Sequence, residues 1–90
     1  MKKIVTSSVS LRRDKSTGWY YSPDGNFEIQ QGTVGWNVYR REIWKTGDVF
    51  WEYENSYETL RDVRASLPYL MEQWKKEFGG RVANEESNQV

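Results

Sequence analysis

Cysteine and histidine are both absent from this chain of 90 residues. Without cysteine it can form no disulfide, no thiolate nucleophile and no cysteine-ligated metal site. Without histidine it lacks the commonest general base and the commonest transition-metal ligand, so a Ser/His/Asp triad is impossible. The acidic residues show no calcium-loop spacing, and the glycines form no phosphate-binding loop. We therefore predict a protein that is not an enzyme and has no catalytic residues, no metal site and no cofactor.

A long apolar run is also missing. No stretch reaches the roughly 18 apolar residues that a membrane-spanning helix requires. Residues 1–5 begin like a signal peptide, but the polar residues 6–10 do not continue as its apolar core. We therefore expect a cytoplasmic protein that does not associate with a membrane.

Charge of one sign does not dominate, since 13 Lys/Arg balance 13 Asp/Glu. The two signs are nevertheless spread unevenly: residues 1–45 have a net charge of +4 and residues 46–90 a net charge of −4. The simpler interpretation is attraction between the two halves of the fold. The functional interpretation is a basic patch that binds an acidic partner.

Aromatic residues are abundant, with five Trp, six Tyr and three Phe. Each aromatic side chain can bury roughly 150–250 Å², so a few of them are enough to close the core of a small domain. The remainder are candidates for a binding surface.

Turn sequences divide the first two thirds of the chain into short strands. In Pro23-Asp24-Gly25, proline presets φ at the second position of the turn and glycine accepts a positive φ. This turn separates the aromatic residues 19–21 from the alternating residues 27–30, which predicts a hairpin. Two further strands are expected at 36–44 and 49–54.

The N-terminal segment has two interpretations. Residues 3–11 show a weak period-two pattern that favours a strand, followed by a polar loop at residues 12–18. Alternatively, residues 1–17 form a flexible basic arm. The sequence leaves both open.

Residues 59–78 predict an amphipathic helix. Thr59 is a good N-cap, and Asp62, three residues later, completes an approximate capping box. Apolar residues then recur at spacings of three and four and form one stripe. The stripe consists of Leu60, Val63, Leu67, Leu70 or Met71, Trp74 and Phe78.

Two features interrupt or end this helix. Pro68 lies inside the stripe and predicts a kink near residues 65–67 or a break into two helices, because proline removes a main-chain hydrogen bond. Gly79-Gly80 predicts the end of the helix. Residues 81–90 are then expected to be a disordered polar tail.

These elements predict a single α+β domain at residues 1–80, with a four- or five-stranded antiparallel sheet packed on one face by a C-terminal helix kinked near Pro68. Alternation assigns the face toward the helix to Phe27, Ile29, Trp36, Val38, Val49, Trp51 and Tyr53. The opposite face would carry Glu28, Asn37, Tyr39, Arg41, Phe50, Glu52 and Glu54. Glu52 and Glu54 are expected to form cross-strand ion pairs with Arg40 and Arg41.

Aromatic and arginine residues on that opposite face and beside it suggest a binding site, since such residues are typical anchors of protein interfaces. We predict a partner-binding site formed by Tyr39, Arg41, Trp44 and Phe50. The alternative is that Trp44 and Phe50 belong to a second, smaller core under the N-terminal segment.

Basic residues suggest nucleic acid as an alternative partner, because they could clamp phosphates along one side of the sheet. The candidates are Arg12, Arg13, Lys15, Arg40, Arg41 and Lys45. Glu28, Glu52 and Glu54 are predicted on the same face and would repel a duplex. The isoelectric point near 6.3 is also below that of typical nucleic-acid binders.

The chain shows two family resemblances. A short antiparallel sheet followed by residues 57–65, with Thr59 opening a helix that contains Ala65, is similar to AP2 and phage-integrase arm-type DNA-binding domains. This resemblance covers about residues 35–70 and implies DNA binding, although the third strand here is acidic where those families carry basic and aromatic residues. Residues 19–29, Gly35-Trp36-Asn37-Val38 and Thr59-Leu60 look like small orphan proteins of phages and mobile elements, which implies a fold but no known activity.

The leading hypothesis is a small non-enzymatic binding protein that presents an aromatic and arginine-bearing sheet face or edge to a protein partner. It could serve as a phage accessory protein or as an inhibitor of a host factor. The alternative is a DNA-binding module of integrase-arm or AP2 type. We expect a monomer or a homodimer formed through an edge strand.

Overall fold

The computed structural model describes residues 9–88, with side chains up to residue 79. Within this part, the chain forms a five-stranded antiparallel sheet and one C-terminal helix, which confirms the predicted α+β class. In chain order the elements are β1 (Arg12–Arg13), β2 (Tyr20–Tyr21), β3 (Phe27–Gln31), β4 (Trp36–Ile43), β5 (Val49–Tyr57) and α1 (Leu60–Asn88).

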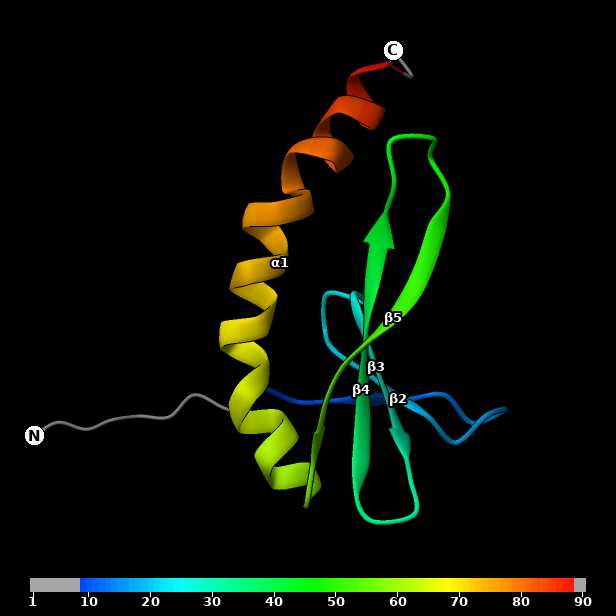
Figure 1. Ribbon diagram of the computed structural model, residues 1–90, viewed down its shortest axis with the longest axis vertical. Coiled ribbons are helices and arrows are strands. Elements are labelled where there is room, and N and C mark those ends of the chain that lie inside the picture. Colours follow the sequence, from blue (N-terminus) through cyan, green and yellow to red (C-terminus); the bar gives the residue numbers. More distant parts are fainter. Residues whose placement is uncertain (1–8, 89–90) are drawn as a thin grey trace, which may run out of the picture.

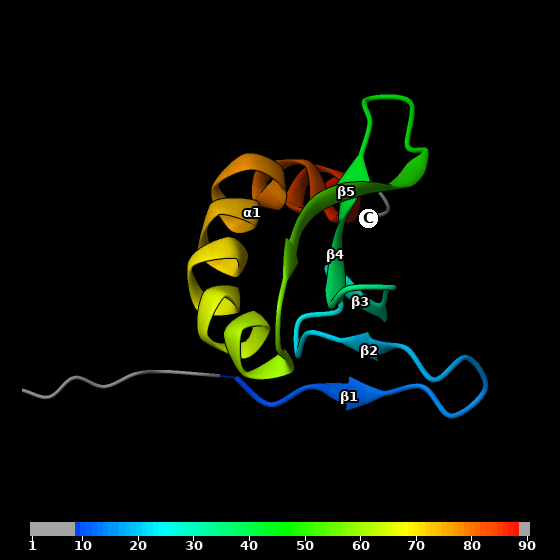
Figure 2. The same cartoon turned by 60° about the horizontal axis from the view of Figure 1, so that its bottom comes forward.

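The sheet is a meander in which every strand pairs with the next along the chain, in the order β1-β2-β3-β4-β5. Figure 2 shows the strands in this order, with α1 covering one side of the sheet. β4 and β5 are the longest strands, and their hairpin projects past β3, beside the C-terminal half of α1 (Figure 1). β5 therefore forms one edge of the sheet and β1 the other.

The N-terminal segment does form a strand, but its paired residues are Arg12–Arg13, which the sequence analysis placed in a loop. The Asp14 N–H donates to the Trp19 carbonyl (2.8 Å), and the Gly18 N–H donates to the Asp14 carbonyl (2.7 Å), so a tight turn fixes this pairing. Val9 donates instead to the Arg64 carbonyl of α1 (3.3 Å). The predicted strand at 3–11 and the basic arm at 1–17 lie partly in residues 1–8, outside the described residues.

The core lies between α1 and the adjacent face of the sheet. The helix contributes its predicted apolar stripe, in which four side chains are fully buried and Leu60, Leu70 and Met71 are partly buried. The buried residues are Phe27, Ile29, Val38 and Ile43 from the sheet and Val63, Leu67, Trp74 and Phe78 from α1.

The predicted turn and cap are confirmed. Gly25 has φ +76°, and its N–H donates to the Ser22 carbonyl (2.9 Å), which closes the turn between β2 and β3. The Thr59 hydroxyl accepts a hydrogen bond from the Asp62 N–H (3.1 Å), as an N-cap does.

The predicted faces of β5 are partly wrong because the strand contains a β-bulge. Val38 lies opposite Asn55, but the next residue, Tyr39, lies opposite Tyr53, so Glu54 is an extra residue on β5. An extra residue reverses the alternation of side chains on one side of it. As a result Val49, Trp51 and Tyr53 do not share the buried face of Phe27, Ile29 and Val38, and all three are exposed.

The bulge also corrects the predicted opposite face. Glu28, Tyr39 and Tyr53 share one row across the open face of the sheet, as the register shows. Phe50 and Glu52, which were predicted on that face, lie instead opposite Glu42 and Arg40, on the side that faces α1.

The helix α1 differs from expectation at its end. Pro68 lies inside α1, and the helix continues through it while its axis bows, with both ends leaning toward the sheet (Figure 1). Long helices commonly curve in this way around the core that they cover, whereas a proline is typical of a sharper kink. Gly79-Gly80 does not end the helix, which runs on to Asn88. Glycine costs about 1 kcal/mol in a helix relative to alanine, too little by itself to stop it.

Candidate functional site

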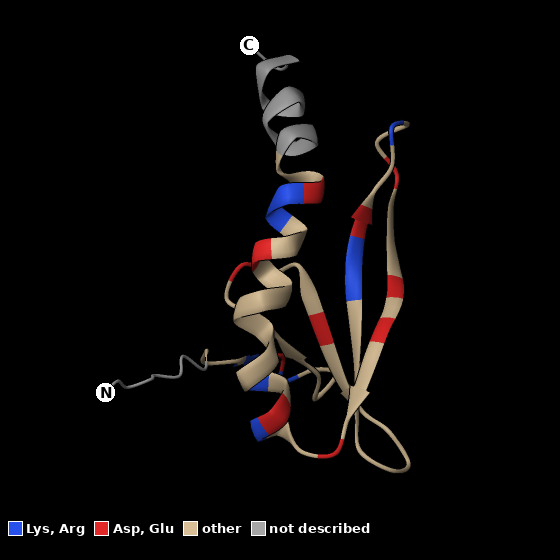
Figure 3. Cartoon of the chain, turned by 60° about the vertical axis from the view of Figure 1, so that its left-hand side comes forward, with Lys and Arg blue, Asp and Glu red and all other residues tan. Residues whose placement is uncertain are grey.

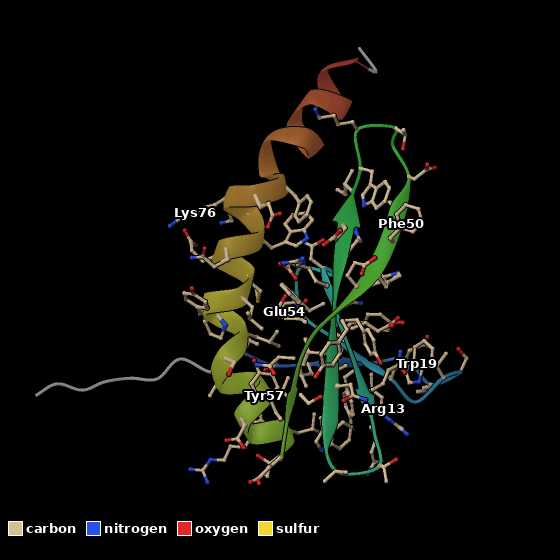
Figure 4. All side chains as sticks on the ribbon, viewed as in Figure 1. Arg13, Trp19, Phe50, Glu54, Tyr57 and Lys76 are labelled. Carbon is tan, nitrogen blue, oxygen red and sulfur yellow. The ribbon has the colours of Figure 1, made fainter. Side chains whose placement is uncertain are left out.

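The end of the β4–β5 hairpin, residues 41–53, is here called the ribbon; residues 41–51 of it project past β3. β3 begins at Phe27, opposite Arg40, so the ribbon has no strand neighbour beyond its own two strands. All five residues Val49–Tyr53 are exposed, and their edge of the sheet faces solvent. Phe50 lies near the outer end of the ribbon in Figure 4.

Aromatic side chains gather on the ribbon. Trp44 and Phe50 pack against each other with ring centroids 4.6 Å apart, and both remain exposed, at 48% and 41%. Tyr53 is 58% exposed and contacts Tyr39 edge-to-face at 6.0 Å. Trp51 is also exposed. The ribbon therefore carries most of the large exposed apolar side chains of the described residues.

The outer edge of β5 presents unpaired main-chain groups. Arg41 lies directly opposite Trp51, yet the Arg41 N–H donates to Asn26 (2.9 Å) and the Arg41 carbonyl accepts from Trp74 Nε1 (2.6 Å). In an antiparallel ladder, opposite residues either exchange both main-chain hydrogen bonds or neither. Arg41 and Trp51 are therefore a non-hydrogen-bonded pair, and the N–H and C=O of Trp51 point outward.

The same alternation applies along the strand. The N–H and C=O groups of Val49 and Tyr53, two residues before and after Trp51, also point outward, whereas those of Phe50 and Glu52 point toward β4. The free edge thus offers main-chain donors and acceptors at three alternate residues. The side chains of Trp51 and Tyr53 lie on the open face of the sheet, and that of Val49 lies opposite the buried Ile43.

The side of the sheet that faces α1 carries a cluster of charges around Arg40. The Arg40 guanidinium forms ion pairs with Glu42 (2.5 Å), Glu54 (3.4 Å) and Glu77 of α1 (4.0 Å). Burial lowers the pKa of Arg40, but the hydrogen bond to Glu42 and the nearby carboxylates outweigh burial and leave that pKa above its usual value. Figure 4 shows Glu54 between α1 and the sheet.

The predicted ion pairs of β5 are realised only in part. Glu54 contacts Arg40, but Glu52, which lies opposite Arg40 in the register, forms no ion pair with a residue that the structure describes. Arg41 contacts neither carboxylate and places its guanidinium over the Trp74 ring, 5.7 Å from the centroid. Negative charge on this side of the ribbon therefore exceeds the positive charge of Arg40.

The open face of the sheet holds a network around a buried carboxylate. Glu28 is only 8% exposed, and it accepts hydrogen bonds from the Tyr21 hydroxyl (2.9 Å) and from Gln30 Nε2 (3.0 Å). Tyr21 also contacts Trp51 edge-to-face, with ring centroids 6.4 Å apart. This contact links the β2 end of the sheet to the ribbon.

The four predicted partner-binding residues do not share one face. Tyr39 and Arg41 belong to the open face and are partly buried, whereas Trp44 and Phe50 pack together at the ribbon's outer end. Sequence reasoning missed Val49, Trp51 and Tyr53, because strict alternation assigned them to the core. No residue in the strand marks the bulge at Glu54, so no signal in the sequence would have found them.

The six predicted nucleic-acid contacts lie at separate places. Arg12 and Arg13 line a cavity of about 400 Å³ with Asp14, Tyr21 and Gly25, and Lys15 lies in the adjacent turn. Arg40 and Arg41 are engaged by carboxylates and by Trp74, and Lys45 lies in the turn at the tip of the ribbon. In Figure 3 acidic and basic residues are interspersed along α1 and the β4–β5 hairpin.

Among the described residues, no three potential ligand side chains lie where they could together hold a metal ion, and none of the helical segments has the length and apolar character of a membrane span. Comparison with known protein families, curated proteins and solved structures found no match to this chain. The two family resemblances stay predictions, and function has to be argued from the site.

Proposed function

We propose that this protein is a small non-enzymatic binding protein that engages a protein partner through the ribbon. The observation that carries the proposal is the exposure of all five residues Val49–Tyr53 on a strand with a single strand neighbour. Exposed edge strands rich in apolar residues are liable to pair with other chains, and proteins normally blunt or cover them. An edge left open and lined with aromatic side chains fits a surface that a partner covers.

The residue types support this assignment. Trp, Tyr and Phe are enriched at protein interfaces, and a few such anchors carry most of the binding energy. The ribbon presents Trp44, Phe50, Trp51 and Tyr53. Of the four residues first predicted, Trp44 and Phe50 are the exposed anchors, while Tyr39 supports Tyr53 from the neighbouring strand.

A capture experiment with a matched control tests the proposal. The wild-type chain and a Phe50→Ala/Trp51→Ala variant are immobilised and exposed to a lysate of the source organism, and retained proteins are identified by mass spectrometry. The control is Tyr69→Ala, which removes an aromatic that is 68% exposed on α1, away from the ribbon. We expect a protein that the wild type and Tyr69→Ala retain equally and that the double variant retains at least about tenfold less, as for interface hot spots.

Two outcomes would overturn this assignment. Equal retention by the wild type and both variants would place the site elsewhere, and retention of no protein by the wild type would exclude protein binding. A DNA gel shift at low salt tests the DNA-binding alternative. If Arg12→Ala/Arg13→Ala abolished the shift and Phe50→Ala/Trp51→Ala kept it, DNA binding would replace protein binding as the proposed function. The phage context and the host-factor target stay predictions.

A further inference from the structure

We propose that the ribbon's occupant is an extended segment of the partner that pairs with β5 as a sixth strand and alternates apolar with basic side chains. This inference rests on the proposed function and specifies the chemistry of the partner. It follows from three features of the ribbon: its free main-chain groups, its aromatic face and its unbalanced negative charge.

The main-chain groups determine how the segment binds. Val49, Trp51 and Tyr53 direct their N–H and C=O groups away from β4, as the hydrogen bonds of Arg41 require. An extended peptide beside β5 would satisfy them by continuing the ladder. Addition of a strand to an open edge is a recurrent mode of peptide recognition, in which main-chain bonds supply affinity and alternate side chains supply specificity.

The open face determines one half of the segment's side chains. Trp51 and Tyr53 point to this face, Val49 lies in line with them opposite the buried Ile43, and all three are exposed. Residues of the added strand that lie beside them would bury apolar surface against Trp51 and Tyr53, which favours Val, Ile, Leu or an aromatic residue at alternate positions.

The other face determines the remaining half. Glu52 lies on that face without an ion pair to a described residue, and Glu54 shares Arg40 with Glu42 and Glu77. One guanidinium therefore serves three carboxylates, and a fourth lies opposite it. Figure 3 shows acidic bands on β5 and no basic one. Lys or Arg at the intervening positions of the added strand would balance this charge.

The same charge disfavours a second copy of this chain as the occupant. β5 contains Glu52 and Glu54 and no Lys or Arg. If two copies paired antiparallel around Tyr53, Glu52 of each copy would lie opposite Glu54 of the other. Like charges directly opposite each other destabilise a strand pair, so self-pairing in this register is disfavoured.

Synthetic peptides test both parts of the proposal. The probe is a capped nine-residue peptide in which Lys and Val alternate, titrated into the ¹⁵N-labelled full chain and followed by NMR. We expect saturable shifts of the Val49, Trp51 and Tyr53 amides. A peptide with Glu in place of Lys should bind at least about tenfold more weakly. A Lys–Val peptide N-methylated at the residues that bond β5 keeps its charge and should lose at least about tenfold in affinity.

Variants of the protein supply the matched control. Glu52→Lys should weaken binding of the Lys–Val peptide by about fivefold or more, because it reverses a charge beside the edge that forms no ion pair with a described residue. Glu72→Lys makes the same change at an exposed position on α1 and should leave affinity unchanged.

The outcomes separate this inference from the proposed function. Equal binding of the N-methylated peptide would exclude strand addition, and equal binding of the Glu–Val peptide would exclude a basic occupant. Either result, combined with loss of partner capture by Phe50→Ala/Trp51→Ala, would overturn the inference and leave the ribbon as the binding surface. A dimer in sedimentation that Trp51→Ala dissociates would identify a second copy as the occupant and also overturn it.

Discussion

The part of the sheet beneath α1 and the ribbon contain similar side chains in opposite surroundings. Phe27, Ile29 and Val38 are at most 1% exposed, whereas Val49 and Trp51 are 48% and 39% exposed. Both regions alternate apolar with polar residues. The difference has two causes. α1 covers only one side of the sheet, and the extra residue Glu54 turns Trp51 and Tyr53 to the other side, where both stay exposed. Hydrophobicity alone therefore does not decide which strand residues become core.

The largest change in stability is expected when one aliphatic side chain is truncated in the core between α1 and the sheet and compared with one in the ribbon. Leu67→Ala removes a fully buried side chain from α1 and should lower the free energy of unfolding by about 2–5 kcal/mol, through lost burial and a cavity. Val49→Ala in the ribbon should cost less than about 1 kcal/mol. Urea unfolding followed by circular dichroism measures both. Similar costs would mean that the ribbon is part of the core.

A smaller effect is expected at the end of the sheet that lies away from the ribbon. A Cβ on Gly35 would lie 2.4 Å from the Tyr57 carbonyl oxygen, so Gly35→Ala forces apart the β3–β4 turn and the end of β5. We expect a loss of about 1–3 kcal/mol, as for other overpacked sites. Gly79→Ala is the control, because its Cβ would meet Lys75 at an ordinary 3.6 Å, and it should raise stability by up to about 1 kcal/mol. Destabilisation by both changes would contradict the close approach to Tyr57 as the cause of the loss at Gly35.

Tyr21→Phe examines the network between the sheet's buried carboxylate and the ribbon. It removes a hydroxyl that donates to Glu28 (2.9 Å), and Gln30 remains as the other donor, so we expect a loss of about 1–2 kcal/mol. Tyr53→Phe removes an exposed hydroxyl that bonds Ser56 and should cost less than about 0.5 kcal/mol. Thermal unfolding at neutral pH compares the two variants. A larger loss of stability in Tyr53→Phe would show that the Tyr21 hydroxyl is not the more important of the two.

Tyr21 should also make the stability of the fold depend on pH. Burial, together with the hydrogen bond to Glu28, raises the pKa of Tyr21 in the folded protein above its usual value near 10. Its contribution to stability is therefore complete below that value and is lost as the pH rises through the folded pKa. Absorbance at 295 nm should show a tyrosine that ionises above its usual pKa near 10, and Tyr21→Phe should remove that step.

The smallest effect is expected at the turn between β1 and β2. Hydrogen bonds from the Ser16 N–H and hydroxyl lower the pKa of Asp14 below its usual value. A carboxyl whose pKa is depressed on folding stabilises the fold above its unfolded pKa, and this contribution is lost as the pH falls through the folded pKa. Asp14→Asn should flatten the acid side of the stability curve slightly. An unchanged curve would show that the Asp14 carboxylate does not contribute to the pH dependence of stability.

Much of the fold could be predicted from local sequence. The turn at Pro23-Asp24-Gly25, the N-cap at Thr59 and the inward stripe of α1 each follow from interactions within a few residues, and the structure contains all three. The candidate site was predicted less well. Its aromatic residues Trp44 and Phe50 were identified, but Trp51 and Tyr53 were assigned to the core, because alternation was extended through a bulge that leaves no trace in composition.

The sequence by itself therefore determined the class of fold, the strands and helix that build it, and the types of side chain available for binding. These depend on short-range sterics, capping and periodicity. Tertiary structure decided which side of the sheet α1 covers, where the β-bulge at Glu54 lies, and which aromatic residues stay exposed. Those choices depend on pairing between residues far apart in the chain, because the register of β4 and β5 sets the direction of every side chain in the ribbon.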